Sequence, residues 1–143
     1  MNYKVRLMLA ACVVLTTALM VVSCVSPAKE HLNKGNEYFE RGQYDEAIVE
    51  CTKAIKLEPQ LTMAYNNRGL AYHKKGELDK AIADFSKAIE LDPNYAEAYF
   101  NRAYAYHRKG GEVAKAASDL EKCIEMSTDP RLLDAAKQLL ERL

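Results

Sequence analysis

Three histidines are the side chains of this 143-residue sequence best suited to bind a metal ion. If the chain repeats with a period equal to the spacing between His73 and His107, these two residues hold equivalent places in neighbouring units. Imidazole is a common zinc ligand, but a zinc site takes at least three protein ligands, and no third can be identified. We therefore predict no metal and no cofactor. His73 and His107 are interpreted as solvated residues, and His31 is expected to have a packing role.

No combination of residues that would support catalysis is present. The sequence contains no glycine-rich phosphate loop, no HExxH motif, no CxxC pair and no Ser/His/Asp elbow. Its 20 basic and 20 acidic residues are finely mixed, whereas a nucleic-acid partner requires a basic stripe to neutralise phosphates. The sequence thus predicts no enzyme, no nucleic-acid binding and no small-molecule substrate.

Cys24 follows a segment that has the features of a secretory signal. Residues 1–6 are basic, residues 7–22 form an uncharged apolar run, and Ser23 precedes the cysteine. The stretch 21–24, VVSC, resembles the lipobox of bacterial lipoproteins, although Leu is commoner where Val21 stands. The resemblance implies a signal peptide at 1–23, cleavage before Cys24, lipidation of its sulfur, and a very short tether at 24–27.

An uncleaved anchor is the alternative interpretation of the same segment. Residues 7–25 number 19, close to the ~20 that a membrane-spanning helix needs. The basic residues before it would stay in the cytoplasm. Either interpretation places the rest of the chain in the bacterial cell envelope, outside the cytoplasmic membrane and anchored to it.

The rest of the chain repeats itself with a fixed period. Residues 60–93 have counterparts, position by position, in 26–59 and in 94–127. Within 60–93, apolar and small residues recur at helical spacing over 64–72 and over 78–89, and Gly76 lies in the turn between them. Each unit therefore predicts an antiparallel helix hairpin, and hairpins of this kind bury their faces by stacking.

The units resemble the tetratricopeptide repeat (TPR), with an aromatic residue, a small residue, Tyr, Ala and a second aromatic at the family's spacing. The match covers residues 28–130 and implies an all-α fold: a right-handed α-solenoid of TPR 1 (28–59), TPR 2 (60–93) and TPR 3 (94–129). In TPR 3 the pair Gly110-Gly111 adds a residue, which is expected to lengthen the inner turn. The positions to which the resemblance gives a structural role are Gly35, Tyr38, Ala47, Tyr65, Gly69, Tyr72, Ala81, Phe85, Ala88, Tyr99, Ala103, Tyr106 and Ala116.

Residues 130–143 are predicted to form a capping helix. Asp129 is suited to the N-cap and Pro130 to the first helical position. The segment has one apolar and one polar face, as the end of a stack requires. Cys51 and Cys123, two repeats apart, are too distant for a disulfide and are expected to be buried thiols.

The TPR resemblance also implies a concave groove, lined by the outer stripe of each first helix. Aromatic and aliphatic residues among adaptable polar ones suit a peptide or an amphipathic helix of a protein partner, whose identity the sequence does not give. The predicted groove residues are Lys29, Leu32, Asn36, Phe39, Met63, Asn66, Asn67, Leu70, His73, Lys74, Glu97, Phe100, Asn101, Tyr104, His107 and Arg108.

Some TPR co-chaperones clamp the C-terminal carboxylate of heat-shock chaperones with Lys, Asn, Asn, Lys and Arg. The matching positions here keep only the two asparagines, and an acid at 97 would repel a carboxylate, so that activity is not expected. The leading hypothesis is a membrane-tethered scaffold that binds a protein during assembly of an envelope complex. The alternative is an accessory ligand-binding subunit of an envelope enzyme or of a secretion or pilus system, which would require a deep pocket.

Overall fold

A computed structural model describes residues 26–143 of the chain, and the predicted signal peptide and Cys24 lie outside the described residues. This part of the chain consists of helices joined by short links and contains no strand. The helices are α2 (Pro27–Glu40), α3 (Tyr44–Leu57), α4 (Thr62–Lys74), α5 (Leu78–Leu91), α6 (Ala96–Lys109), α7 (Val113–Met126) and α8 (Pro130–Leu140).

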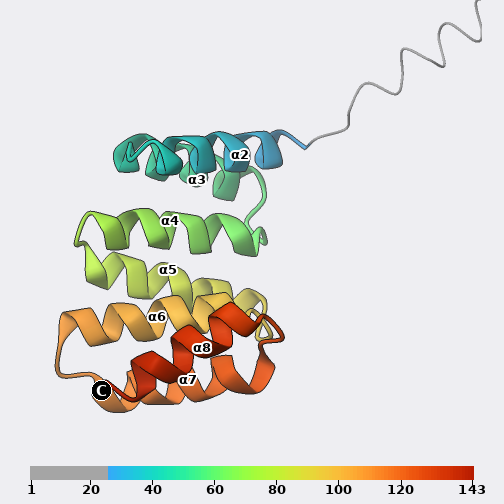
Figure 1. Cartoon of the computed structure of the whole chain (residues 1–143). Coiled ribbons are helices and arrows are strands. Elements are labelled where there is room, and N and C mark those ends of the chain that lie inside the picture. Colours follow the sequence, from blue (N-terminus) through green and yellow to red (C-terminus); the bar gives the residue numbers. More distant parts are fainter. Residues whose placement is uncertain (1–25) are drawn as a thin grey trace, which may run out of the picture.

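Consecutive helices form three antiparallel hairpins, α2–α3, α4–α5 and α6–α7, stacked one on the next (Figure 1). The first helices of the hairpins, α2, α4 and α6, also contact one another in sequence order. The predicted all-α solenoid is confirmed. Because each hairpin touches only its neighbours, the molecule is held together by the contacts within each hairpin and between adjacent ones.

The helix ends follow local sequence. Ser26 is the N-cap of α2, where its Oγ accepts a hydrogen bond from the Lys29 N–H at 3.3 Å, and Pro27 begins the helix. Gly76, which ends the turn after α4, has φ +80°, a left-handed conformation that glycine adopts without steric cost. The chain thus uses few, well-placed residues to set where each helix begins and stops.

The link between α6 and α7 differs from expectation. Residues 110–112 form a link of the same length as 41–43 and 75–77, so the prediction of a longer inner turn is wrong. Instead, α6 runs to Lys109, one residue beyond the position equivalent to the end of α4. The inserted residue is accommodated because the helix extends and both Gly110 and Gly111 adopt positive φ.

The core consists mainly of alanines, with a few larger side chains between them. Phe85, Leu120, Cys51 and Cys123 are the largest side chains that are fully buried. Burial raises the pKa of both cysteine thiols to about 11, which keeps them protonated and unreactive at neutral pH. Both are free thiols, as the sequence predicted.

The last helix, α8, covers the end of the stack. The Asp129 carboxylate accepts a hydrogen bond from the Arg131 N–H at 2.9 Å, and Pro130 occupies the first turn. Ala136 and Leu139 are buried in the cluster formed with α6 and α7, and Leu132, Leu140 and Leu143 pack at its edge. The helix itself ends at Leu140, three residues short of the predicted boundary.

Candidate functional site

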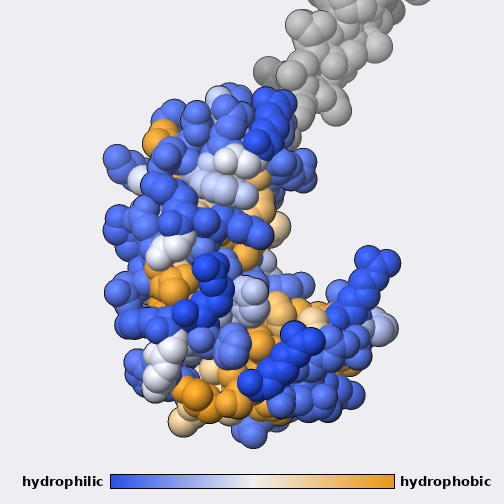
Figure 2. Space-filling view, turned by 60° about the vertical axis from the view of Figure 1, so that its left-hand side comes forward, coloured by the Kyte–Doolittle hydropathy of each residue, from blue (hydrophilic) through white to orange (hydrophobic). Residues whose placement is uncertain are grey.

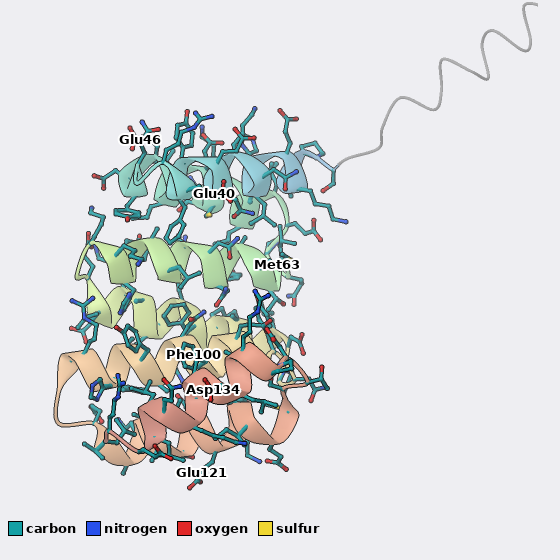
Figure 3. The ribbon with its side chains drawn as sticks, in the orientation of Figure 1. Glu40, Glu46, Met63, Phe100, Glu121 and Asp134 are labelled. Carbon is teal, nitrogen blue, oxygen red and sulfur yellow. The ribbon has the colours of Figure 1, made fainter. Side chains whose placement is uncertain are left out.

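The first helices of the three hairpins present one open face, on which Figure 3 labels Glu40, Met63 and Phe100. Glu46 and Glu121, which come from second helices, lie at the opposite ends of the stack in the same view. Figure 2 shows a curved body whose hydrophobic surface gathers inside the bend and toward the C-terminal repeats. The sequence placed its predicted groove on this face.

Two adjacent hollows open on this face. The first, between α2 and α4, has a volume of about 210 Å³ and is lined by Asn36, Phe39, Glu40, Asn67 and Leu70. The second, the α4–α6 hollow, has a volume of about 200 Å³ and is lined by Leu70, His73, Lys74, Phe85, Phe100, Asn101 and Tyr104. Leu70 forms the ridge between them. Both are smaller and more open than the ~300–1,000 Å³ clefts that enclose small ligands.

Aromatic side chains supply most of the apolar surface. The Phe100 and Tyr104 rings are stacked with their centroids 6.4 Å apart, and Tyr104 is 41% exposed. Met63, 51% exposed, lies near the start of α4. Large exposed aromatic and thioether side chains of this kind are typical anchors for a protein partner.

Asparagine amides link the three first helices across the groove. Asn67 donates a hydrogen bond to Asn36 at 2.5 Å, which joins α4 to α2. Asn101 donates to Asn66 at 3.0 Å, which joins α6 to α4. These bonds hold the floor of the groove in register, and they occupy part of the hydrogen-bonding capacity of the amides.

Three predicted groove residues are not on the free surface. Leu32 is buried in a cluster with Ala54 and Ala64, because the small side chain of Ala64 lets α4 approach α2 closely. Asn66 is buried beneath the amide of Asn101. For these two residues the assignment to the open groove is wrong.

His73 is likewise buried, at 7% exposure, and not solvated as predicted. The Tyr104 ring packs against it, with centroids 5.2 Å apart. Burial lowers its pKa, and the nearby Arg108 and Lys74 cations lower it further, so the imidazole is neutral at pH 7. Its Nε2 atom has no hydrogen-bond partner among residues 26–143. His107, its counterpart one repeat later, is exposed.

The other predicted groove residues form an exposed charged rim. Lys29, Lys74, Glu97, His107 and Arg108 are all exposed. No cluster of three or more His, Cys, Asp or Glu side chains that could hold a metal ion occurs within residues 26–143. Over the same residues, no helix combines the length and the apolar character required to cross a bilayer.

Sequence reasoning missed two partly buried ion pairs that recur one repeat apart. Arg68 donates two hydrogen bonds to the Asp84 carboxylate, at 2.8 and 2.7 Å, and a third to Thr52 Oγ1 at 3.1 Å. Arg102 repeats this arrangement with Asp119 and Ser86, at 2.8, 2.7 and 3.0 Å. Each arginine therefore ties its own hairpin to the preceding one. The recurrence of an Arg and an Asp at equivalent places in the two units was the signal that could have revealed them.

Family models for the TPR repeat match residues 35–76 and 71–110, and a model for the tetratricopeptide repeat matches residues 96–130. The chain belongs to the tetratricopeptide-repeat family. The TPR pattern accounts for the buried Gly35, Gly69 and Ala103 at the crossing points of the hairpins. Comparison with curated proteins gives no match.

Solved TPR domains are similar along most of the chain. The first TPR of Spaghetti (RPAP3), bound to the HSP90 peptide SRMEEVD, is 30% identical, with a TM-score of 0.71 over 80% of this chain and 93% of that one. The TPR2B domain of yeast Sti1, in a complex with pHsp70, is 31% identical, with a TM-score of 0.69 over 78% and 97%. The first TPR domain of human RPAP3 is 29% identical, with a TM-score of 0.74 over 80% and 87%.

Five positions of this TPR protein match the carboxylate clamp of the co-chaperones. Leu32 is buried, Asn36 and Asn67 bond to each other, and Glu97 is an exposed acid. Asn101 donates to Asn66. No cation occupies any of these places, so this geometry does not provide the clamp that would neutralise a terminal carboxylate.

Proposed function

We propose that this TPR protein is a membrane-tethered scaffold that binds a peptide or an amphipathic helix of a protein partner in its groove. One observation carries the proposal: exposed or half-exposed apolar side chains line two adjacent open hollows on the face of α2, α4 and α6. Solved relatives bound to HSP90 and HSP70 peptides support a peptide as the class of ligand. The shallow hollows argue against the alternative of an accessory subunit that encloses a small molecule.

Tyr104→Glu is expected to weaken binding of the partner. The ring is 41% exposed and lines the α4–α6 hollow, so the change removes apolar surface on which the partner would pack and puts a charge beneath it. Losses at such anchors are typically ~2 kcal/mol or more, which corresponds to about a thirtyfold weaker affinity. The partner would first be captured in cells by a photoreactive phenylalanine analogue at position 104, and its affinity then measured by titration calorimetry.

Matched controls separate binding from folding. Val49→Glu with Val113→Glu places the same charge at exposed sites on second helices, where the valines are 52% and 49% exposed. This control should bind normally and have a free energy of unfolding within ~0.5 kcal/mol of the parent's, and Tyr104→Glu should remain folded. Leu70→Glu is less suitable, because Leu70 packs partly on the buried cluster of Ala81 and Phe85. Equal capture by a photoreactive residue at position 113 would argue against the groove.

The proposed tether is a lipid on Cys24, in the bacterial cell envelope. Cys24→Ala should abolish acylation, leaving an unprocessed precursor or releasing a protein that no longer partitions with membranes. Intact-mass measurement of the membrane fraction is the test, with Cys12→Ala, inside the apolar run, as the control. An acylated mature product from Cys24→Ala would contradict the proposal, and a parent protein without acyl mass would favour the uncleaved anchor.

A further inference from the structure

The two hollows of the groove differ in charge. Glu40 borders the hollow between α2 and α4, whereas Lys74 borders the α4–α6 hollow. Arg108 occupies the place on α6 that Lys74 occupies on α4, one repeat later. One acid therefore borders the first hollow and one cation borders the second.

The two cations are unpaired within the described part of the chain, residues 26–143. Lys74 and Arg108 take part in none of its ion pairs, although each is followed by a lysine that does. Lys75 pairs with Asp45 and Glu77, and Lys109 pairs with Asp79 at 2.6 Å. Each of these two repeats thus ends its first helix with one engaged lysine and one free cation at the groove. Free neighbouring cations favour the approach of an anion.

A second observation concerns a buried polar atom in the wall of the same hollow. His73 lies in the wall of the α4–α6 hollow and is only 7% exposed. Its Nε2 atom has no hydrogen-bond partner among residues 26–143. Leaving a buried polar atom unpaired destabilises a protein by ~1–3 kcal/mol. The Tyr104 ring packs against His73, with centroids 5.2 Å apart, and is itself 41% exposed.

The apolar surface beside these groups is well defined. Leu70, Phe100 and Tyr104 are half-buried or exposed, and the last two rings are stacked. An aliphatic or aromatic side chain of a partner would be covered by these three residues. Its immediate neighbour in the partner would then lie near the ends of α4 and α6, where the two cations are.

We infer that the α4–α6 hollow binds a partner segment in which an apolar side chain stands next to an aspartate or glutamate. The apolar side chain packs on Leu70, Phe100 and Tyr104, and the carboxylate pairs with Lys74 and Arg108. The acid is an internal side chain and not a chain terminus, because the clamp positions hold buried Leu32 and the acid Glu97. This inference rests on the proposed peptide-binding function and specifies its ligand.

The test is selection of peptides by the full chain, purified in detergent. The probe is a random peptide library displayed through its C-terminus, so that no free terminal carboxylate is offered. The parent chain should enrich peptides that carry an acid beside an apolar residue. Lys74→Glu with Arg108→Glu should enrich peptides with a basic residue there and bind the acidic peptides at least about tenfold more weakly. Lys56→Glu with Lys137→Glu carries the same change of charge on exposed cations elsewhere and should select as the parent does.

The outcomes distinguish this inference from the function on which it rests. Enrichment that depends on Tyr104 but shows no acid preference, or keeps it after charge reversal, overturns the inference and leaves the proposed function standing. No enrichment by the parent chain contradicts both. A parent chain that is dimeric, and becomes monomeric on charge reversal, would identify a second copy as the occupant and also overturn the inference.

Discussion

Gly69→Leu is expected to unfold most of the protein. A Cβ atom built on Gly69 would lie 2.7 Å from Phe85 Cε1 and 2.9 Å from Cδ1 of the same ring, closer than real Cβ contacts allow. Phe85 is fully buried, so its ring cannot move aside. A leucine would have to separate α4 from α5 and lose the packing between them. We expect a loss above ~4 kcal/mol, from a total of ~5–15 kcal/mol, measured by urea denaturation.

The third repeat supplies the control for this prediction. There Ala103 and Leu120 occupy the places that Gly69 and Phe85 occupy in the second repeat, and both are fully buried. Gly69→Ala and Phe85→Leu should each destabilise the protein, by ~1–3 kcal/mol, whereas the double variant should lose less than the sum. Gly76→Ala, where nothing lies within 4 Å of the added Cβ atom, tests backbone strain alone. Additive losses at 69 and 85 would show that the two positions do not share one space.

The fold could be predicted from the sequence because stacked hairpins repeat both their helices and their spacing. The fixed period places α4, α6 and α8 at equivalent starts, Thr62, Ala96 and Pro130. Small residues at equivalent places, such as Gly69 and Ala103, then indicate where helices cross. Local patterns of this kind depend on contacts that recur from unit to unit, so the helices of one unit predict those of the next.

The groove could be predicted only in part, because burial there depends on pairs of helices and not on one helical face. Leu32 and Asn66 share a stripe with exposed residues, but the neighbouring first helix covers both. His73 and His107 are equivalent in sequence, yet among residues 26–143 an aromatic ring packs over His73, whereas His107 is exposed. Contacts between repeats therefore decide which members of the stripe a partner can reach.

The partly buried arginines illustrate the same limit. Arg68 lies within the helical pattern over 64–72, but the pattern gives no partner for it, because Asp84 is 16 residues away on another helix. The first repeat has Lys34 and Glu50 at the equivalent places, but Lys34 pairs with Glu30, and Glu50 pairs with His31 and Lys53. Within residues 26–143, the second and third repeats therefore have this Arg–Asp pair and the first repeat does not.

Asp84→Ala is expected to be among the most destabilising changes that leave the apolar core intact. It would remove both acceptors from Arg68, whose side chain is only 18% exposed, while Thr52 alone would remain bonded to it. Removing one member of a buried ion pair typically costs ~3–5 kcal/mol, because the other charge stays desolvated. Because the guanidinium is partly exposed, we expect the free energy of unfolding to fall by about 3 kcal/mol, the lower end of that range.

Two comparisons make the measurement specific. Asp79→Ala removes an exposed pair with Lys109, whose side chains are 82% and 42% exposed, and should cost at most ~1 kcal/mol. Arg68→Met with Asp84→Leu removes both charges together and should recover most of the stability that Asp84→Ala loses, since no unpaired charge remains. Denaturation of the three variants in urea at neutral pH gives the ranking. If the double variant were no more stable than Asp84→Ala, the pair would contribute directional bonding between hairpins that apolar packing cannot replace.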